Sequence, residues 1–220
     1  MKQAPLGFFD TSVGKKMVMG ITGFIVFGFV IAHILGNLQL FMGPEKINNY
    51  AALLHSLGGF LWAFRIVLLL SAILHVVAAT QVTLQSLRAR PARYKIRRNR
   101  QTTYAAQTMR YGGPIILLFV IYHLFHLTFG SAHAAFTDNV YNNVVVGFQV
   151  WWIALVYIAA IVSVGLHLYH GVWSMFQSMG VAHPKWNALR KALAIAFALA
   201  ITLAGISIPI AVLSGVIKPV

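Results

Sequence analysis

Histidine is the residue type in this chain whose number and placement suggest chemistry. The sequence has nine histidines, and six lie inside long apolar runs: His33, His75, His123, His126, His167 and His170. An ionisable side chain inside such a run is costly and usually functional, and the neutral imidazole is a common metal ligand. Two imidazoles from facing helices suit a six-coordinate haem iron. The histidines therefore predict a metal or haem site.

These histidines lie in segments long enough to cross a lipid bilayer, which takes about 20 mainly apolar residues per helix. Five segments meet this length, at about residues 17–41, 59–87, 112–133, 147–176 and 193–216. The chain is 59% hydrophobic and 9% charged, whereas a soluble domain is about 25% charged. We expect an all-α integral membrane bundle of five transmembrane helices, forming a single domain over residues 1–220 with haems within its four-helix core.

Two local features refine this expectation. Pro114 is expected in the first turn of the third span, where proline is tolerated because the first amide groups of a helix have no partner. The segment from Glu45 to Leu57 is expected to form a short helix that lies at the outer surface.

Depth along the spans separates four histidines into two levels. His33 and His123 each lie ten residues from the outer span end, counted to residues 43 and 133, or roughly 15 Å at the helical rise. His75 and His167 lie sixteen and twenty residues from residues 59 and 147, or roughly 24 to 30 Å. The depths pair His33 with His123 and His75 with His167, and we predict that each pair supplies the axial ligands of one haem iron.

Three alternatives compete with this assignment. His126 and His170 each lie three residues beyond a predicted ligand on nearly the same helix face. Depth favours His123 and His167, because His126 would lie shallower and His170 deeper than the corresponding partner. Zinc is a second alternative, although two levels do not converge on one tetrahedral centre. Hydrogen-bonded histidines without any metal are the third.

The cations indicate which end of the bundle faces the cytoplasm. Of 17 Lys and Arg, fourteen precede the first span or follow the second and fourth spans. The opposite side has Lys46 and Lys218, and Arg65 lies inside the second span. Cytoplasmic segments carry the excess of Lys and Arg, so we expect a multi-pass protein of the cell inner (cytoplasmic) membrane, with its N-terminus cytoplasmic and its C-terminus outside.

The net charge of +14 is concentrated in short segments between apolar runs. This distribution favours membrane topology over nucleic-acid binding, so no nucleic-acid partner is expected. The basic segment 88–110 has three interpretations: a determinant of topology, a contact with anionic lipid, or a docking surface for a soluble partner.

Four stretches around the paired histidines resemble a known family. They are FVIAHILGN around His33, AILHVV around His75, LLFVIYHLFH around His123 and GLHLYHGVWSM around His167. Their order and spacing resemble the di-haem cytochrome b anchor subunit of succinate dehydrogenases and fumarate reductases (succinate:quinone oxidoreductases), in the class with one large five-helix anchor.

This resemblance implies a function. The anchor would bind two haem b groups, with His75 and His167 holding the proximal haem near the cytoplasm, and His33 and His123 the distal haem. Its partners would be a flavoprotein subunit that oxidises succinate and an iron–sulfur subunit that passes electrons on. The electrons would then reach a membrane quinone, commonly menaquinone.

The chain has no cysteine and no nucleotide-phosphate loop, so no dicarboxylate chemistry is expected in it. The related alternative is the di-haem cytochrome b subunit of respiratory nitrate reductase. A cofactor-free membrane protein, such as a small transporter or an assembly factor, is the alternative from another class.

Overall fold

The computed structural model describes residues 7–89, 104–181 and 183–220. Within these ranges the chain forms seven α-helices and no strand, which confirms the all-α prediction. The five long helices are α1 (Ser12–Asn37), α3 (Gly59–Arg88), α4 (Tyr104–His123), α6 (Trp151–Ser178) and α7 (Asn187–Leu213). The two shorter helices are α2 (Pro44–Ser56) and α5 (Val140–Gln149). Short helical turns are η1 (Phe8–Asp10), η2 (Leu38–Met42), the π-helical η3 (Leu124–Thr128) and η4 (Pro184–Trp186).

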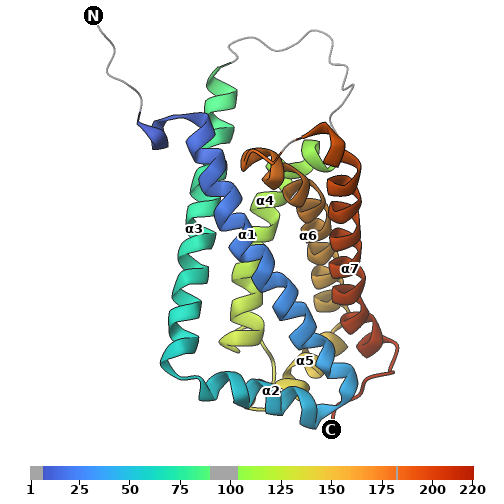
Figure 1. Cartoon of the computed structure of the whole chain (residues 1–220). Coiled ribbons are helices and arrows are strands. Elements are labelled where there is room, and N and C mark those ends of the chain that lie inside the picture. Colours follow the sequence, from blue (N-terminus) through green and yellow to red (C-terminus); the bar gives the residue numbers. More distant parts are fainter. Residues whose placement is uncertain (1–6, 90–103, 182) are drawn as a thin grey trace, which may run out of the picture.

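The five long helices run side by side, and α2 and α5 lie at the end of the bundle where the C-terminus is found (Figure 1). Glycines with positive φ turn the chain on both sides of α2, with φ at +100° in Gly43 and +51° in Gly58. Side-chain amides join α2 to α5, because Asn48 donates to Asn139 Oδ1 at 3.1 Å and accepts from the Tyr141 amide at 3.1 Å. The expected short helix over residues 45–57 is therefore present as α2.

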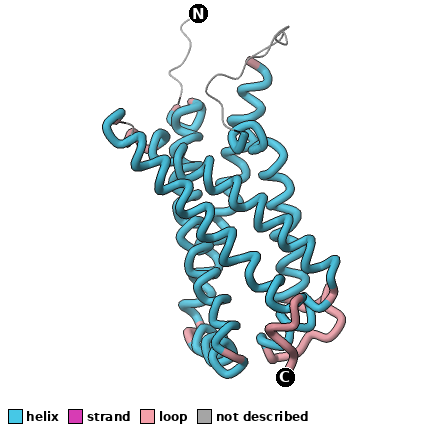
Figure 2. The backbone as a smooth tube through the Cα atoms, turned by 90° about the vertical axis from the view of Figure 1, so that its right-hand side faces the viewer, coloured by secondary structure: helices cyan, strands magenta, loops and turns pink. Residues whose placement is uncertain are grey.

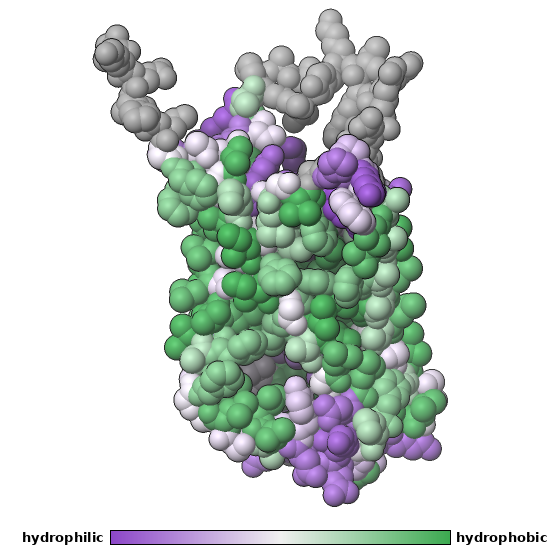
Figure 3. Space-filling view, in the orientation of Figure 1, coloured by the Kyte–Doolittle hydropathy of each residue, from purple (hydrophilic) through white to green (hydrophobic). Residues whose placement is uncertain are grey.

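The outer surface of the bundle is apolar between two polar ends. All five long helices are long and apolar enough to cross a membrane, as predicted. Large apolar side chains face outward, including Phe60, Leu118 and Trp151 at 71, 68 and 65% exposure. Hydrophilic residues gather at the two ends of the molecule, with a hydrophobic band between them (Figure 3). Lipid would cover this band, because contact between apolar side chains and water is unfavourable.

Burial inside the bundle differs from helix to helix. The backbone tube shows the long helices running side by side (Figure 2). The helices α6 and α7 bury many residues against each other and against α5. Of its residues, α3 buries Ser71 and Ala78, and α4 buries Ala105. Both of the buried positions in α3 are small and flank His75, so this part of the helix can approach its neighbour closely.

Three of the predicted span limits differ from the helices because hydropathy marks apolar residues rather than helix ends. The helix α1 begins at Ser12 rather than near residue 17, since the Thr11 side chain caps it by accepting from the Gly14 amide at 3.0 Å. The prediction that Pro114 lies in a first turn is wrong: α4 already includes Tyr104, so Pro114 lies inside the helix. The third span ends at Thr128 rather than near His133.

The fourth and fifth spans also differ from the prediction. Val150 is extended (φ −78°, ψ 101°) and separates α5 from α6, so residues 147–149 belong to α5 and the span begins at Trp151. The fifth helix begins at Asn187, before the expected residue 193. It includes the buried cation Arg190, which donates to the Val181 carbonyl at 2.8 Å and to the Asn187 side chain. Most of the basic segment 88–110 lies outside the described residues, between 90 and 103.

Candidate haem-binding site

The structure brings the four predicted ligands together as two pairs of rings. The ring centres of His33 on α1 and His123 on α4 lie 5.7 Å apart, with an interplanar angle of 89°. Those of His75 on α3 and His167 on α6 lie 6.1 Å apart, at 60°. A metal–imidazole bond of about 2.0 Å and about 1 Å from nitrogen to ring centre place two opposed imidazole centres roughly 6 Å apart around one metal ion. Both pairs have this spacing.

The two pairs lie at different levels along the bundle. On α1, Gly23 lies against the His75 ring, because a Cβ built at this glycine would be 3.1 Å from His75 Cε1. His33 follows ten residues later on the same helix, or about 15 Å along its axis. On α6, Tyr157 contacts His123, and His167 again follows ten residues later. Two helices therefore give the same separation between the levels.

The span limits of the structure bring the depths of the deeper pair into agreement. His75 lies sixteen residues after Gly59, and His167 lies sixteen residues after Trp151. His33 lies nine residues before the first span ends at Met42, and His123 lies five before the third span ends at Thr128. His33 is thus close to the ten residues expected, whereas His123 is shallower, because the residues after Thr128 had been counted as part of the third span.

His75 is held in the way that is typical of metal-binding histidines. Its Nδ1 lies 3.0 Å from the Met19 carbonyl oxygen and 3.4 Å from Thr22 Oγ1, both on α1. A histidine that donates one ring N–H to a backbone carbonyl has its tautomer and ring orientation fixed, and the opposite nitrogen is left to bind a metal. Gly23 leaves room for the ring, since a Cβ at this position would be 3.1 Å from His75 Cε1 and would press on it.

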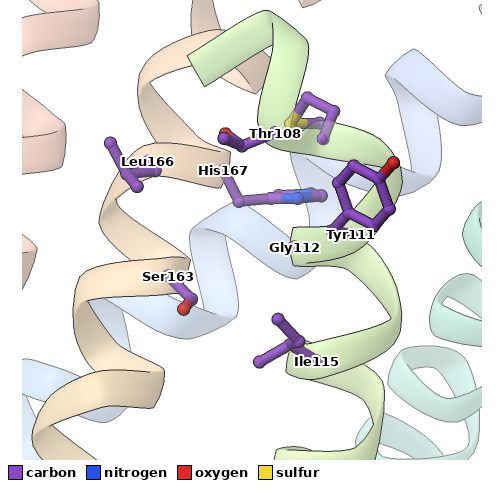
Figure 4. A pocket seen from close by; sticks show the side chains of 8 residues that line it. Thr108, Tyr111, Gly112, Ile115, Ser163, Leu166 and His167 are labelled. Atoms are coloured by element: carbon purple, nitrogen blue, oxygen red, sulfur yellow. The ribbon is translucent and has the colours of Figure 1, made fainter. Parts of the chain in front are cut away.

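His167 projects from α6 toward α4 beside a cavity of about 200 Å³ (Figure 4). The cavity is lined mainly by side chains of these two helices, including Tyr111 and Ser163. His167 Nδ1 is buried and finds no hydrogen-bond partner in the described part of the chain. A buried polar atom without a partner is costly, so this ring is suited to a ligand that enters the space beside it.

The second pair has different surroundings. His123 Nδ1 lies 3.2 Å from the Tyr157 hydroxyl. His33 Nε2 accepts a hydrogen bond from the Asn37 side-chain amide at 3.1 Å within α1. Because the amide nitrogen can only donate, Nε2 of His33 is the unprotonated nitrogen in this geometry. Metal binding at that atom would replace the Asn37 contact.

His126 and His170, the competing histidines, lie beside the ring pairs. His126 is fully buried, and its Nδ1 lies 2.9 Å from the Tyr157 hydroxyl. Its ring stacks on that of His133, with centres 5.0 Å apart, and His133 Nε2 lies 2.8 Å from the Asn143 carbonyl oxygen. His170 is partly buried on α6, three residues beyond His167. These residues surround the His123 and His167 rings rather than replace them in the pairs.

The donor set fits two haem irons better than a zinc ion. Within the described ranges there is no group of three or more His, Cys, Asp or Glu residues that could hold a metal. A structural zinc site needs four protein ligands and a catalytic one needs three, whereas a bis-histidine haem needs two. His75 and His167 would hold one haem, and His33 and His123 the other.

Sequence reasoning missed Gly23 and Tyr157. A tyrosine hydroxyl inside an apolar helix needs a hydrogen-bond partner, so Tyr157 could have been singled out on that ground. Its partners come from η3 and the end of α4, and only the folded arrangement identifies them. Gly23 carries no comparable signal, because glycine is also common where membrane helices pack without a cofactor.

Comparisons of the chain with protein-family models, curated proteins and solved structures found no match. The site is therefore defined by its own geometry: two bis-imidazole positions at two levels of a helix bundle of the membrane type.

Proposed function

We propose that this chain is the di-haem cytochrome b anchor subunit of a succinate:quinone oxidoreductase, the family that its histidine-containing stretches resemble. The proposal rests on one observation: two histidine pairs, each with ring centres close to 6 Å apart, lie at two levels of one bundle. The order of these histidines along the chain is also the order that the resemblance implies.

The residues of the chain would bind the cofactors and fix their orientation. When bound, the two b haems would supply one-electron transfer between the two ends of the bundle. The Met19 carbonyl orients His75, the Tyr157 hydroxyl orients His123, and Gly23 leaves space beside the His75 ring. The apolar outer surface keeps the site inside lipid and away from water.

The cations indicate which haem would lie nearer the cytoplasm, and so the direction in which electrons would move. Lys15, Lys16 and Arg88 belong to the end of the bundle where α1 begins and α3 ends, whereas Lys46 and Lys218 belong to the opposite end. By the excess of Lys and Arg on cytoplasmic segments, the His75–His167 pair would lie nearer the cytoplasm. An iron–sulfur subunit would deliver electrons there, and a quinone, commonly menaquinone in this class, would receive them near the outer side.

The first experiment measures haem content and spectrum. We expect two b-type haems per chain in the purified protein, with a low-spin bis-histidine signal in the oxidised state and a b-type spectrum after reduction with dithionite. A folded, correctly inserted protein without haem would exclude the proposal and favour the cofactor-free alternative.

The second experiment assigns the ligands. His75→Ala or His167→Ala should remove one haem and spare the other, and His33→Ala or His123→Ala should do the converse. His183→Ala is a matched control, because His183 lies in an exposed loop and caps η4. The control should retain both haems. Equal loss of both haems in every single variant, without unfolding, would contradict the two independent pairs.

The third experiment distinguishes the enzyme complexes. The native complex purified through a tag on this chain should contain a flavoprotein and an iron–sulfur protein, and succinate should reduce its haems. A molybdenum-containing partner and reoxidation of the haems by nitrate would instead indicate the nitrate reductase alternative.

A further inference from the structure

The hydroxyl of Tyr157 lies between two histidines at the shallower level of the bundle. It is 3.2 Å from His123 Nδ1 and 2.9 Å from His126 Nδ1. Tyr157 is 3% exposed and His126 is fully buried, so water does not compete for these contacts. One hydroxyl therefore connects a predicted haem ligand to a second histidine that has no place in either ring pair.

The chemistry of the three groups assigns a direction to these bonds. A neutral imidazole that binds iron through Nε2 carries its proton on Nδ1, so His123 would donate to the Tyr157 oxygen. The phenol proton is then free to be donated to His126 Nδ1. His126 would carry its own proton on Nε2, an atom that is buried and has no hydrogen-bond partner among the described residues.

The other ring pair is held differently. His75 Nδ1 is bonded to a backbone carbonyl, that of Met19, and no side-chain substitution removes this acceptor. For His123 the corresponding acceptor is a single hydroxyl. The two predicted haem sites thus differ in the acceptor of the ligand's Nδ1 proton. At His123 this acceptor can be removed by deleting one oxygen atom.

We propose that Tyr157 is the positioning residue for His123: its hydroxyl fixes the imidazole as an Nε2 ligand and raises the basicity of that ring, which lowers the reduction potential of the haem at the His33–His123 pair. This inference rests on the proposed function and adds to it a residue that separates the two haems in potential. A histidine ligand commonly donates the N–H of its other ring nitrogen, the one that does not bind the metal, to an acceptor. This hydrogen bond raises the basicity of the ligand.

The packing around Tyr157 allows its hydroxyl to be removed without a change in the ring contacts. Its ring is held edge-on by Phe119, with centres 5.0 Å apart, and by Phe148 at 4.8 Å. Replacement by phenylalanine retains both contacts and removes the hydroxyl alone. Tyr122 is the matched control, because its ring stacks on His126 with centres 5.5 Å apart while its hydroxyl is buried without a partner in the described chain.

The experiment is a redox titration of the two haems in Tyr157→Phe and Tyr122→Phe, with haem content measured first. We expect Tyr157→Phe to keep two haems and to raise the potential of one. At a fixed potential the ratio of reduced to oxidised haem should rise about threefold to tenfold, or about 30 to 60 mV at 59 mV per tenfold for one electron. Tyr122→Phe should shift neither potential.

Several outcomes would overturn the inference. Unchanged potentials in Tyr157→Phe, an equal shift in Tyr122→Phe, or a shift at the haem that is lost in His75→Ala would each do so while leaving the proposed function standing. Absence of haem from the unmodified protein would instead overturn the proposed function, and the inference with it.

A second variant covers the case in which Tyr157→Phe does not fold. His126→Phe keeps a ring stacked on Tyr122 but removes the group that takes the phenol proton. Loss of this acceptor weakens the hydroxyl as a partner for His123, because hydrogen bonds in a chain strengthen one another. The same haem should rise in potential by a smaller amount, and an unchanged potential would overturn the inference.

Discussion

Substitution of Gly23 by alanine tests whether the His75 ring lies where a haem ligand must lie. A Cβ at this position would be 3.1 Å from His75 Cε1 and 3.3 Å from Nδ1, whereas ordinary contacts begin near 3.4 Å. The ring would have to retreat by a few tenths of an ångström. The His75 ring is held by the Met19 carbonyl at 3.0 Å, and the centre of the His167 ring lies 6.1 Å from its own centre, so little room is left for such a movement.

The magnitude follows from the cost of overpacking. One extra methyl group in a well-packed site destabilises by about 1 to 3 kcal/mol. If this cost falls on the haem-bound state alone, the affinity for one haem should fall about 5-fold to 150-fold. The alanine also stabilises the helix by about 1 kcal/mol relative to glycine, and this gain has to be separated from the steric effect.

Gly28→Ala separates the gain in helix stability from the steric effect on His75. Gly28 lies on the same helix, and a Cβ there would have nothing within 4 Å, so this variant has the helical gain without the contact. The assay is the haem-to-protein ratio of both variants purified under limiting haem, with the optical spectrum identifying which haem is lost.

We expect Gly23→Ala to lose the haem that His75→Ala loses, and Gly28→Ala to keep both. Equal haem content in the two variants would refute the placement of Gly23 against the ligand ring. Loss of the other haem in Gly23→Ala would refute the assignment of levels.

Two further predictions concern packing and topology. A Cβ at Gly165 would overlap Thr202 Oγ1 across the contact between α6 and α7, so Gly165→Ala should lower the free energy of unfolding by about 1 to 3 kcal/mol. The double variant with Thr202→Ala should recover most of this loss in thermal unfolding in detergent, and no recovery would exclude the clash as the cause. Because the chain has no cysteine, a single introduced thiol reports orientation without background. Ser56→Cys should react with an impermeant maleimide in intact cells and His183→Cys only after permeabilisation; the reverse pattern would contradict an N-terminus in the cytoplasm.

The sequence predicted the number of long helices well and their ends less well. The second span was placed within one residue, because Gly58 turns the chain just before it. The third and fifth were placed too late, since the helices continue through polar residues such as Arg190. The Arg190 guanidinium donates to the Val181 carbonyl, nine residues earlier in the chain, and a hydropathy pattern cannot detect that partner.

The neighbouring positions of the histidine rings could be predicted from depth, because residues at similar depth on neighbouring helices can meet. Their role as haem ligands stays a prediction. The sequence could mark Tyr157 as a buried hydroxyl but could not identify its partners, because they lie 31 and 34 positions away. Such contacts arise from the packing of α6 on α4 and the turn after it.

The sparse burial along α3 has a consequence for how the protein persists in a cell. Among the described elements, α3 packs closely on α1, and its buried residues are two small ones beside His75. A haem gripped by His75 and His167 would join α3 to α6 and close the bundle. Without that haem, α3 would have one firm neighbour among the described helices, and a membrane protease could extract it more easily. The abundance of the chain would therefore follow the supply of haem.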